Sequence, residues 1–220
     1  PSNVFYLSGY SGEGLLFLSH DLRAVVTDFR YTEQAEHEAA GFSVHNIEPG
    51  VSHAKVAAKL AADAGIRSVL YEDDKVTVKA FSQMQEAFEG VSFALLDQKP
   101  EQLRAVKDAA ELALIGQACA ISAQGFEFIC GFIRSGMSER EIQLALDFKL
   151  LQLGADGLAF STIVASGSNG SLPHAVPGER RVQKGDFITP DFGARYRGYC
   201  SDMTRTVAVG EPSDELRRIY

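Results

Sequence analysis

The sequence HAVPGERRVQKGDFITPDFGARYRGYCSDMTRTVAVG, residues 174–210, decides the fold expected for the C-terminal half of this chain. It reads as two neighbouring strands of one β-hairpin, joined by a turn centred on Tyr196 and Arg197. In an antiparallel pair, the position of the turn fixes which residues lie opposite each other. This turn pairs Asp191 with Asp202, so the hairpin is predicted to carry two carboxylates on one face.

Two directly opposed carboxylates need a neutralising partner, because Cβ atoms roughly 4.5 to 5.5 Å apart bring like charges close enough to repel. A hard divalent cation relieves the repulsion, and two-metal hydrolytic sites hold ions about 3.5 to 4 Å apart. A proton shared between the carboxyls, as in acid proteases, is a second remedy. A third interpretation is that both are solvated residues beside a turn. A bulge at Gly198 would change the register and turn one side chain to the other face.

Two helices are predicted before the hairpin. From Glu101 to about Ile133, apolar residues recur at helical spacing. The stretch SEREIQLALDFKLLQLG then begins with a capping box of Ser138 and Glu141 and ends at Gly154. This pattern differs from the one found earlier in the chain.

Up to about residue 98, short apolar runs alternate with helical stretches, which is the pattern of a small α/β layer domain. The runs are GLLFLS, RAVVTDF, RSVLYE and VSFALL, and a strand-like run, VFYLSGY, opens the chain. A helix is predicted between Ser52 and Gly65. The polar segment DQKPEQ, residues 97–102, contains a proline and is a candidate linker. The predicted fold class is therefore α/β (α+β), with domains at residues 1–98 and 99–220.

Both ends of the chain look cut. The chain opens at Pro1 without a methionine. After Ser213, a plausible helix N-cap, only about two helical turns follow, too few for a helix to hold without a partner. We therefore expect this chain to be a fragment of a longer protein. Ile188, Val207 and Val209 of the hairpin are then expected to be exposed unless another segment covers them.

Composition excludes several classes of partner. The 21 basic and 29 acidic residues give a formal net charge of -8, and no basic run offers the field that nucleic acid needs. Cys119, Cys130 and Cys200 have no Cys-x-x-Cys spacing and are odd in number, which argues against a disulfide framework or structural zinc site. A reducing cytoplasm fits this usage. No apolar run approaches about 20 residues and no leader opens the chain, so no membrane association is expected.

Several motifs together resemble the metal-dependent Xaa-Pro peptidases, the aminopeptidase P and prolidase branch of the creatinase/aminopeptidase family with its pita-bread fold. In the C-terminal half these motifs are MSEREIQLALDF, FSTIVASGSNGSLPHAVP, DFG and SDMTRTVAVG. FYLSGYSG and TDFRYTEQA resemble the N-terminal domain of that family. A single motif such as Asp-Phe-Gly is weak, but the order and spacing of all of them are specific. The resemblance covers most of the chain.

The resemblance implies roles for four residues. Asp191 and Asp202 match the first two metal ligands of the family, and Asp202 is expected to bridge two ions. The family's remaining ligands, one His and two Glu, are expected after Tyr220. His174 matches the active-site histidine that contacts substrate and helps to stabilise the transition state, although a lone loop histidine is otherwise a surface residue. Thr204 lies on the same strand face as Asp202, where its hydroxyl is expected to orient a carboxylate, although it is also an ordinary strand residue.

Pro190 departs from the apolar residue that is common before the first aspartate of the motif. Because proline has no N–H, it removes one ladder hydrogen bond. The first strand of the hairpin is therefore predicted to be locally distorted or to lie at a sheet edge.

The resemblance implies a metallo-exopeptidase with two divalent ions, Mn, Co or Zn, in which a bridging hydroxide attacks the peptide bond that precedes proline. The expected substrate is a proline-containing peptide or dipeptide, and the full-length protein is expected to be an active homodimer. One alternative is a metal-free creatinase-like C–N hydrolase, against which the presence of both aspartates argues. The other is a non-catalytic peptide-binding protein that kept the fold and lost the site.

Overall fold

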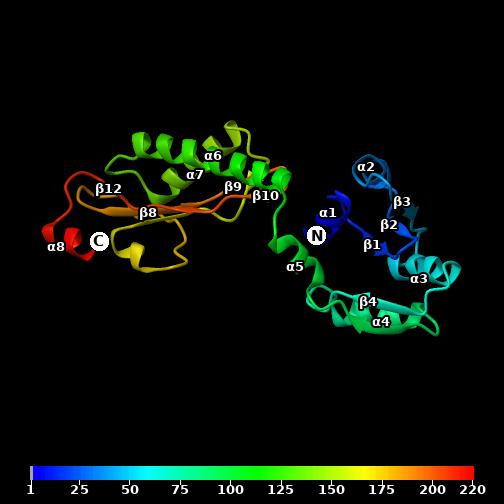
Figure 1. Cartoon of the computed structure of the whole chain (residues 1–220). Helices are drawn as coiled ribbons and strands as arrows, with labels where there is room; N and C mark the ends of the chain where they lie inside the picture. The colour runs from blue at the N-terminus through cyan, green and yellow to red at the C-terminus, as the bar shows by residue number, and fades with distance from the viewer. Residues whose placement is uncertain (1) are drawn as a thin grey trace. The chain divides into compact units, whose positions relative to one another are not determined.

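A computed structural model describes residues 2–220 as two compact units, the first ending at Val106 and the second spanning Lys107–Tyr220 (Figure 1). The units divide a few residues after the predicted boundary at 98. The polar segment interpreted as a linker instead begins helix α5 (Lys99–Ala105), in which Pro100 is buried at the first turn. Proline is well tolerated there, because the first N–H groups of a helix have no partner within it.

The first unit is an α/β layer structure, as predicted. Its first sheet contains β1 (Leu15–Leu18), β2 (Arg23–Thr27) and β3 (Ser43–Asn46), with β1 antiparallel and β3 parallel to β2. A separate parallel pair consists of β4 (Ser68–Tyr71) and β5 (Ser92–Leu95). The connecting helices are α2 (Thr32–Glu38), α3 (His53–Asp63) and α4 (Val78–Ala87). Helical crossovers are what parallel strands require.

The strand predicted at the start of the chain is wrong, because Ser2–Ser8 form helix α1. Asn3 is buried and accepts a hydrogen bond from Arg104 at 2.8 Å. Val4 packs against the cluster around Tyr10. These contacts with residues far away in the sequence outweigh the strand preference of the run.

The second unit places two helices on one side of its strands, which form a four-stranded and a three-stranded sheet (Figure 1). The helices are α6 (Ala109–Phe132) and α7 (Glu139–Gln152). The predicted capping box of Ser138 and Glu141 is confirmed, and a second one, Asp108 with Glu111, begins α6. The remaining elements are β6 (Gly157–Leu158), β7 (Ile163–Ser166), η1 (Gly167–Ser171), β8 (Phe187–Phe192), β9 (Ala194–Tyr196), β10 (Tyr199–Cys200), β11 (Met203–Thr204), β12 (Val207–Ala208) and α8 (Asp214–Ile219).

Helix α6 departs from the expectation that no segment is apolar enough to span a membrane. Within residues 2–220 it alone is long and apolar enough to cross a membrane by length and composition. Core helices of globular proteins meet the same criterion, and Ile121 and Ile129 of α6 are buried against the sheet. One face of the helix therefore belongs to the core of the second unit, while 28% of its most apolar 18-residue stretch is buried.

The predicted pairing of Asp191 with Asp202 is wrong, because Asp191 pairs with Thr204. The turn consists of Arg197 and Gly198, whose φ angles are 47° and 83°. Two-residue hairpin turns with positive φ at both central positions match the twist of the strands, and glycine favours them. The turn thus lies one residue further along the chain than predicted, which shifts the pairing by two residues. Because side chains alternate with a period of two, the shift leaves both aspartates on the same face.

Pro190 interrupts the hydrogen-bond ladder in the middle of the sheet. Strand β8 lies between β7 on one side and β11 and β12 on the other, so the predicted edge position is wrong. The Arg205 N–H donates to the Pro190 carbonyl at 3.1 Å, but proline has no N–H to donate in return. The break between Thr204, the end of β11, and Val207, the start of β12, lies opposite this proline. The interruption therefore falls on the partner strand, whereas β8 itself is continuous from Phe187 to Phe192 and the predicted distortion of the first strand is not seen.

The apolar side chains of the hairpin face the helices. Ile188 and Phe192 are fully buried in the cluster formed with α6 and α7, and Val207 and Val209 pack against that cluster. The prediction that Ile188, Val207 and Val209 are exposed is therefore wrong, because the two helices cover them. The opposite face of the hairpin carries Asp191.

Candidate metal centre

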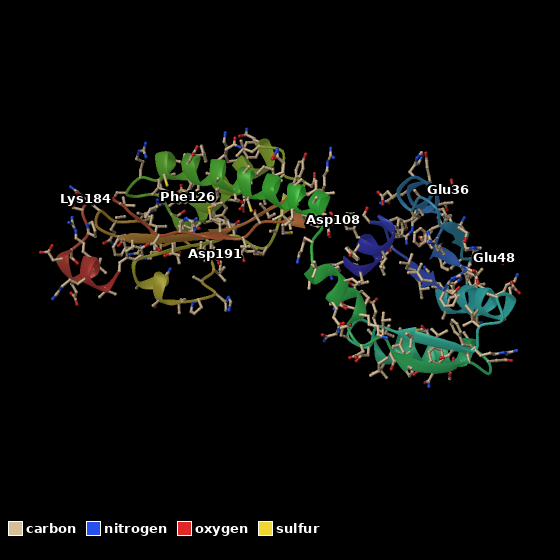
Figure 2. All side chains as sticks on the ribbon, viewed as in Figure 1. Glu36, Glu48, Asp108, Phe126, Lys184 and Asp191 are labelled. Atoms are coloured by element: carbon tan, nitrogen blue, oxygen red, sulfur yellow. The ribbon has the colours of Figure 1, made fainter. Side chains whose placement is uncertain are left out.

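The open face of the hairpin presents Asp191 beside a hydroxyl group. Along β8, buried residues alternate with half-buried ones, and Asp191 belongs to the half-buried set that points away from α6 and α7 (Figure 2). Thr204 lies directly opposite and donates a hydrogen bond from Oγ1 to Asp191 Oδ1 at 2.9 Å. This bond leaves the other carboxylate oxygen of Asp191 available to a ligand.

Asp202 lies on the same face, two residues before Thr204. Its neighbours on either side face the helices, since Ser201 is buried and Met203 packs against the core, while Asp202 itself is exposed. Asp202 is therefore a diagonal neighbour of Asp191, and residues in this relation lie about 7 to 8 Å apart, with Cβ atoms somewhat closer. The two carboxylates are close without direct opposition.

Glycine and serine residues hold the Asp202 strand segment in place. A Cβ atom on Gly193 would lie 2.0 Å from the Ser201 carbonyl oxygen, so only glycine allows the two strands to approach this closely. Ser201 Oγ in turn lies 2.7 Å from Ser122 Oγ of α6, and both side chains are buried. The backbone beside Asp202 is thus attached to the helix layer.

The donor set fits part of a site for a hard divalent ion. Two aspartate carboxylates are oxygen donors of the kind that Mg²⁺, Mn²⁺ and Ca²⁺ prefer. Within residues 2–220, no group of three or more His, Cys, Asp and Glu side chains is placed to hold a metal. Asp191 and Asp202 are therefore suited to contribute to a metal site that needs further ligands.

His174 lies in the loop that follows η1, where its side chain is exposed. The start of this segment, η1, packs against β7 and β8, and Ile163 of β7 pairs with Asp191. The sequence placed His174 in a loop, and the structure agrees. Its contact with substrate stays a prediction.

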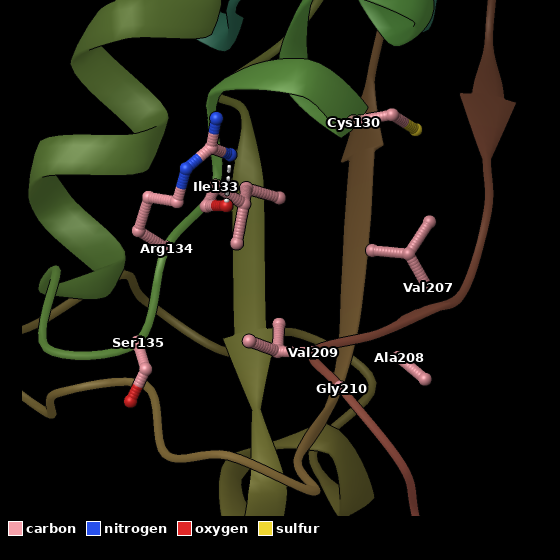
Figure 3. A pocket seen from close by; sticks show the side chains of 8 residues that line it. All are labelled: Cys130, Ile133, Arg134, Ser135, Val207, Ala208, Val209 and Gly210. Atoms are coloured by element: carbon pink, nitrogen blue, oxygen red, sulfur yellow. Dashed lines mark hydrogen bonds between the residues drawn. The ribbon is translucent and has the colours of Figure 1, made fainter.

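Two cavities of the structure are lined by none of the candidate site residues, which are His174, Asp191, Asp202 and Thr204. One, of about 380 Å³, lies between the end of α6 and β12 (Figure 3), and its lining is Cys130, Ile133, Arg134, Ser135, Val207, Ala208, Val209 and Gly210. The other, of about 750 Å³, lies within the first unit and is mostly apolar. The candidate metal centre is instead an open surface of the hairpin.

Sequence reasoning missed two features of this region. The turn at Arg197 and Gly198 carried a usable signal, because glycine at the second central position favours a turn with positive φ. Glu139, by contrast, is fully buried at the start of α7 and binds residues on two later segments. Only the tertiary structure brings those groups together.

Comparison with known families assigns both units. The model of the Creatinase/Prolidase N-terminal domain matches residues 1–106, and the model of Metallopeptidase family M24 matches residues 113–220. The two matches adjoin near the division between the compact units after Val106.

Individual relatives agree with this assignment. The uncharacterized peptidase YqhT of Bacillus subtilis is 39% identical over 220 residues, which are 100% of this chain and 62% of the relative. The crystal structure of X-Pro aminopeptidase from Thermotoga maritima has a TM-score of 0.91 and 38% identity, over 99% of this chain and 62% of that one. Xaa-Pro dipeptidase from Bacillus anthracis has a TM-score of 0.93 and 38% identity, over 99% and 61%. The chain thus spans about 62% of the length of its curated relatives.

Proposed function

We propose, from the premise that this chain belongs to metallopeptidase family M24 and carries a creatinase/prolidase N-terminal domain, that the whole protein is a metal-dependent exopeptidase. Its proposed reaction is hydrolysis of the peptide bond that precedes proline. The substrates are dipeptides or longer peptides with proline in the second position. The solved relatives named above are an X-Pro aminopeptidase and an Xaa-Pro dipeptidase, which supports this substrate class.

One structural observation carries the proposal. Asp191 and Asp202 occupy the same open face of one hairpin, and Thr204 donates a hydrogen bond to Asp191. The two carboxylates are diagonal neighbours, so they lie near one another without the repulsion of a directly opposed pair. Two carboxylates on one face of a hairpin, Asp191 in β8 and Asp202 between β10 and β11, are suited to divalent ions.

Each residue has a separate task in the proposed reaction. Asp191 and Asp202 would hold the metal ions, and Thr204 orients the Asp191 carboxylate through its hydrogen bond. Bound divalent ions lower the pKa of water and polarise a carbonyl group. His174, exposed in its loop, binds substrate and donates a hydrogen bond to the oxygen that gains charge in the transition state.

The other interpretations are less well supported. The named solved relatives are Xaa-Pro peptidases, so neither the metal-free creatinase-like hydrolase nor the non-catalytic binding protein is favoured. We also propose a cytoplasmic location, because the three cysteines are free and exposed. A homodimer is proposed from the family resemblance alone.

The test uses the full-length protein loaded with Mn²⁺, Co²⁺ or Zn²⁺. It is assayed on an Xaa-Pro dipeptide, on a longer Xaa-Pro peptide and on matched Xaa-Ala peptides. We expect hydrolysis only of the proline peptides, and loss of both bound metal and activity in Asp191→Asn and Asp202→Asn. The proposal would be refuted if the metal-free protein, or both variants, hydrolysed the proline peptides as fast as the metal-loaded wild-type protein.

A further inference from the structure

Glu139 is a buried carboxylate that the reaction proposed above does not use. It is the first residue of α7, it is 0% exposed, and it receives hydrogen bonds from three residues of later segments. Burial of an ionised carboxylate is costly unless donors surround it. The arrangement around Glu139 therefore needs an explanation.

The donors come from both ends of one loop, residues 167–178. At the start of the loop, Ser166 donates to Glu139 Oε1 from its backbone N–H and from its hydroxyl, both at 2.8 Å. At the end, the Gly178 N–H donates to Oε2 at 3.3 Å. Asn169 donates its side-chain amide to both carboxylate oxygens at 3.1 Å. One carboxylate thus joins the two ends of the loop.

Backbone hydrogen bonds hold the end of the loop against α7. The N–H groups of Glu139 and Arg140, which have no partner inside the helix, donate to the carbonyls of Arg180 and Gly178, both at 3.1 Å. The Val182 N–H donates to the Met137 carbonyl at 2.9 Å. The Glu139 side chain, through Ser166, attaches the start of the loop to α7 as well.

Arg180, just after the end of the loop, binds Ser166, just before its start. Arg180 donates to Ser166 Oγ and to both oxygens of Asp186, whose side chain is 14% exposed. Its guanidinium group lies against Gly167, where a Cβ atom would come within 2.1 Å of Nη2. Gly167 also has a φ of +50°, so side chains are disfavoured there for two reasons.

The loop closed in this way contains His174. Its length falls within the range of roughly 6 to 16 residues of compact Ω-loops, whose ends lie close together. Figure 1 shows its η1 segment on the side of β8 that faces away from α6 and α7. That is the face that carries Asp191.

We propose that Glu139 is a positioning residue: it closes the loop of residues 167–178 and so holds His174 in place for the reaction. The inference rests on the proposed function, because His174 has a task only in that reaction. Glu139 itself does not touch substrate. A free loop would adopt many conformations, so ordering it costs conformational entropy. The hydrogen bonds to the Glu139 carboxylate offset that cost.

The test compares Glu139→Gln with Glu141→Gln in the full-length, metal-loaded protein. Glutamine keeps the shape of Glu139 but places an NH₂ group against the donors of Asn169 and Gly178. Glu141 is the matched control on the same helix turn, because glutamine retains its capping box with Ser138. The measurements are hydrogen exchange of the loop amides, kcat and KM on an Xaa-Pro dipeptide, and metal content.

For Glu139→Gln we expect roughly tenfold faster exchange in residues 168–177, as the loss of charge-assisted hydrogen bonds implies. We expect kcat to fall by about 100-fold with metal content nearly unchanged and with a much smaller rise in KM, because the displaced histidine stabilises the transition state more than the bound substrate. Asn169→Ala, which leaves the Ser166 and Gly178 bonds intact, should show the same pattern more weakly. Glu141→Gln should match the wild-type protein in all measurements.

Wild-type exchange in the loop of Glu139→Gln would overturn the proposal. So would faster exchange without a fall in kcat, because the loop would then not serve the reaction. If Glu139→Gln fails to fold, Asn169→Ala still tests the proposal, because it removes one donor and leaves the Glu139 carboxylate in place. If the wild-type protein hydrolyses no Xaa-Pro peptide, the proposed function fails, whereas the exchange data still decide whether Glu139 closes the loop.

Discussion

Thr204 shows how one hydroxyl can matter at the scale of single residues. It is exposed, so its packing contributes little, and its one described side-chain hydrogen bond goes to Asp191. Groups that orient a metal ligand affect metal binding more than they affect folding. We therefore propose that Thr204 acts together with Asp191 in metal binding.

Thr204→Val should weaken metal binding by about 10- to 100-fold and leave the melting temperature almost unchanged, because valine keeps the shape and loses the hydroxyl. Calorimetric titration of the metal-free full-length protein with Mn²⁺ measures the change. Thr206→Val is the control, since Thr206 pairs its hydroxyl with Thr189 on the same face. An equal loss of affinity in both variants would remove the special role of Thr204.

Asp186 provides a pH-dependent contribution to stability. Burial alone would raise its pKa, but hydrogen bonds from Arg180 and the Gln183 N–H, together with the guanidinium charge, lower the pKa below its ordinary value of 3.8. The ionised form is therefore favoured in the folded protein. This contribution to stability is present above 3.8 and is lost as the pH falls through the lowered pKa.

Asp186→Asn should lower the free energy of unfolding by about 2 kcal/mol near neutral pH, because it leaves the partly buried Arg180 without its carboxylate. The difference from the wild-type protein should shrink as the pH falls below 3.8. Urea unfolding at several pH values measures both quantities. Asp21→Asn is a suitable control, because the Asp21 side chain is 92% exposed. A difference that grows toward acid pH would contradict the assignment.

At the scale of elements, the hairpin depends on two residues that are unusual within strands. Pro190 divides the partner strand into β11 and β12, and Gly193 allows the Ser201 carbonyl to approach. Both residues flank the Asp-Phe segment of the motif Asp-Phe-Gly. The motif is therefore a structural feature as well as a source of the Asp191 carboxylate.

Gly193→Ala should destabilise the second unit by about 1 to 3 kcal/mol, because the new Cβ would lie 2.0 Å from the Ser201 carbonyl oxygen and would force the strands apart. The movement should also displace Asp202 and weaken metal binding. Gly170→Ala is the control, since no atom lies within 4 Å of its added Cβ and its φ is not in the left-handed region. Thermal unfolding and metal titration of the full-length variants decide between these outcomes.

At the scale of the whole molecule, the number of metal ligands limits what this chain can do. The described residues hold no group of three possible ligands, and the proposed site has two in this chain, Asp191 and Asp202. Catalytic metal sites require several protein ligands and room for water. The chain spans about 62% of the length of its curated relatives. We expect the further ligands in the remaining part of the whole protein.

The 220-residue chain alone should therefore bind Mn²⁺ weakly and hydrolyse no Xaa-Pro peptide. Addition of the remaining segment of the whole protein should restore both properties, because it would complete the ligand set. Metal titration and a peptidase assay with and without that segment test the prediction. Robust hydrolysis by the 220 residues alone would mean that the chemistry belongs to other residues.

Local sequence signals predicted those features that depend on residues a few positions apart. The capping box of Ser138 and Glu141, the N-caps Ser52 and Ser213 and the main strand runs are all present, because each depends on neighbouring backbone and side-chain groups. The motif order also identified the family. The alternation of side chains kept Asp191 and Asp202 on one face even though the predicted register was wrong.

Tertiary structure alone decided what depends on distant residues. The run at the start of the chain is a helix whose buried Asn3 binds Arg104, a residue 101 positions away in the sequence. The attachment of both ends of the His174 loop to Glu139 joins groups on three separate segments. Such contacts follow from packing in three dimensions, to which local propensity is a weak guide, because a buried polar group takes its partner from whichever segment the fold brings to it.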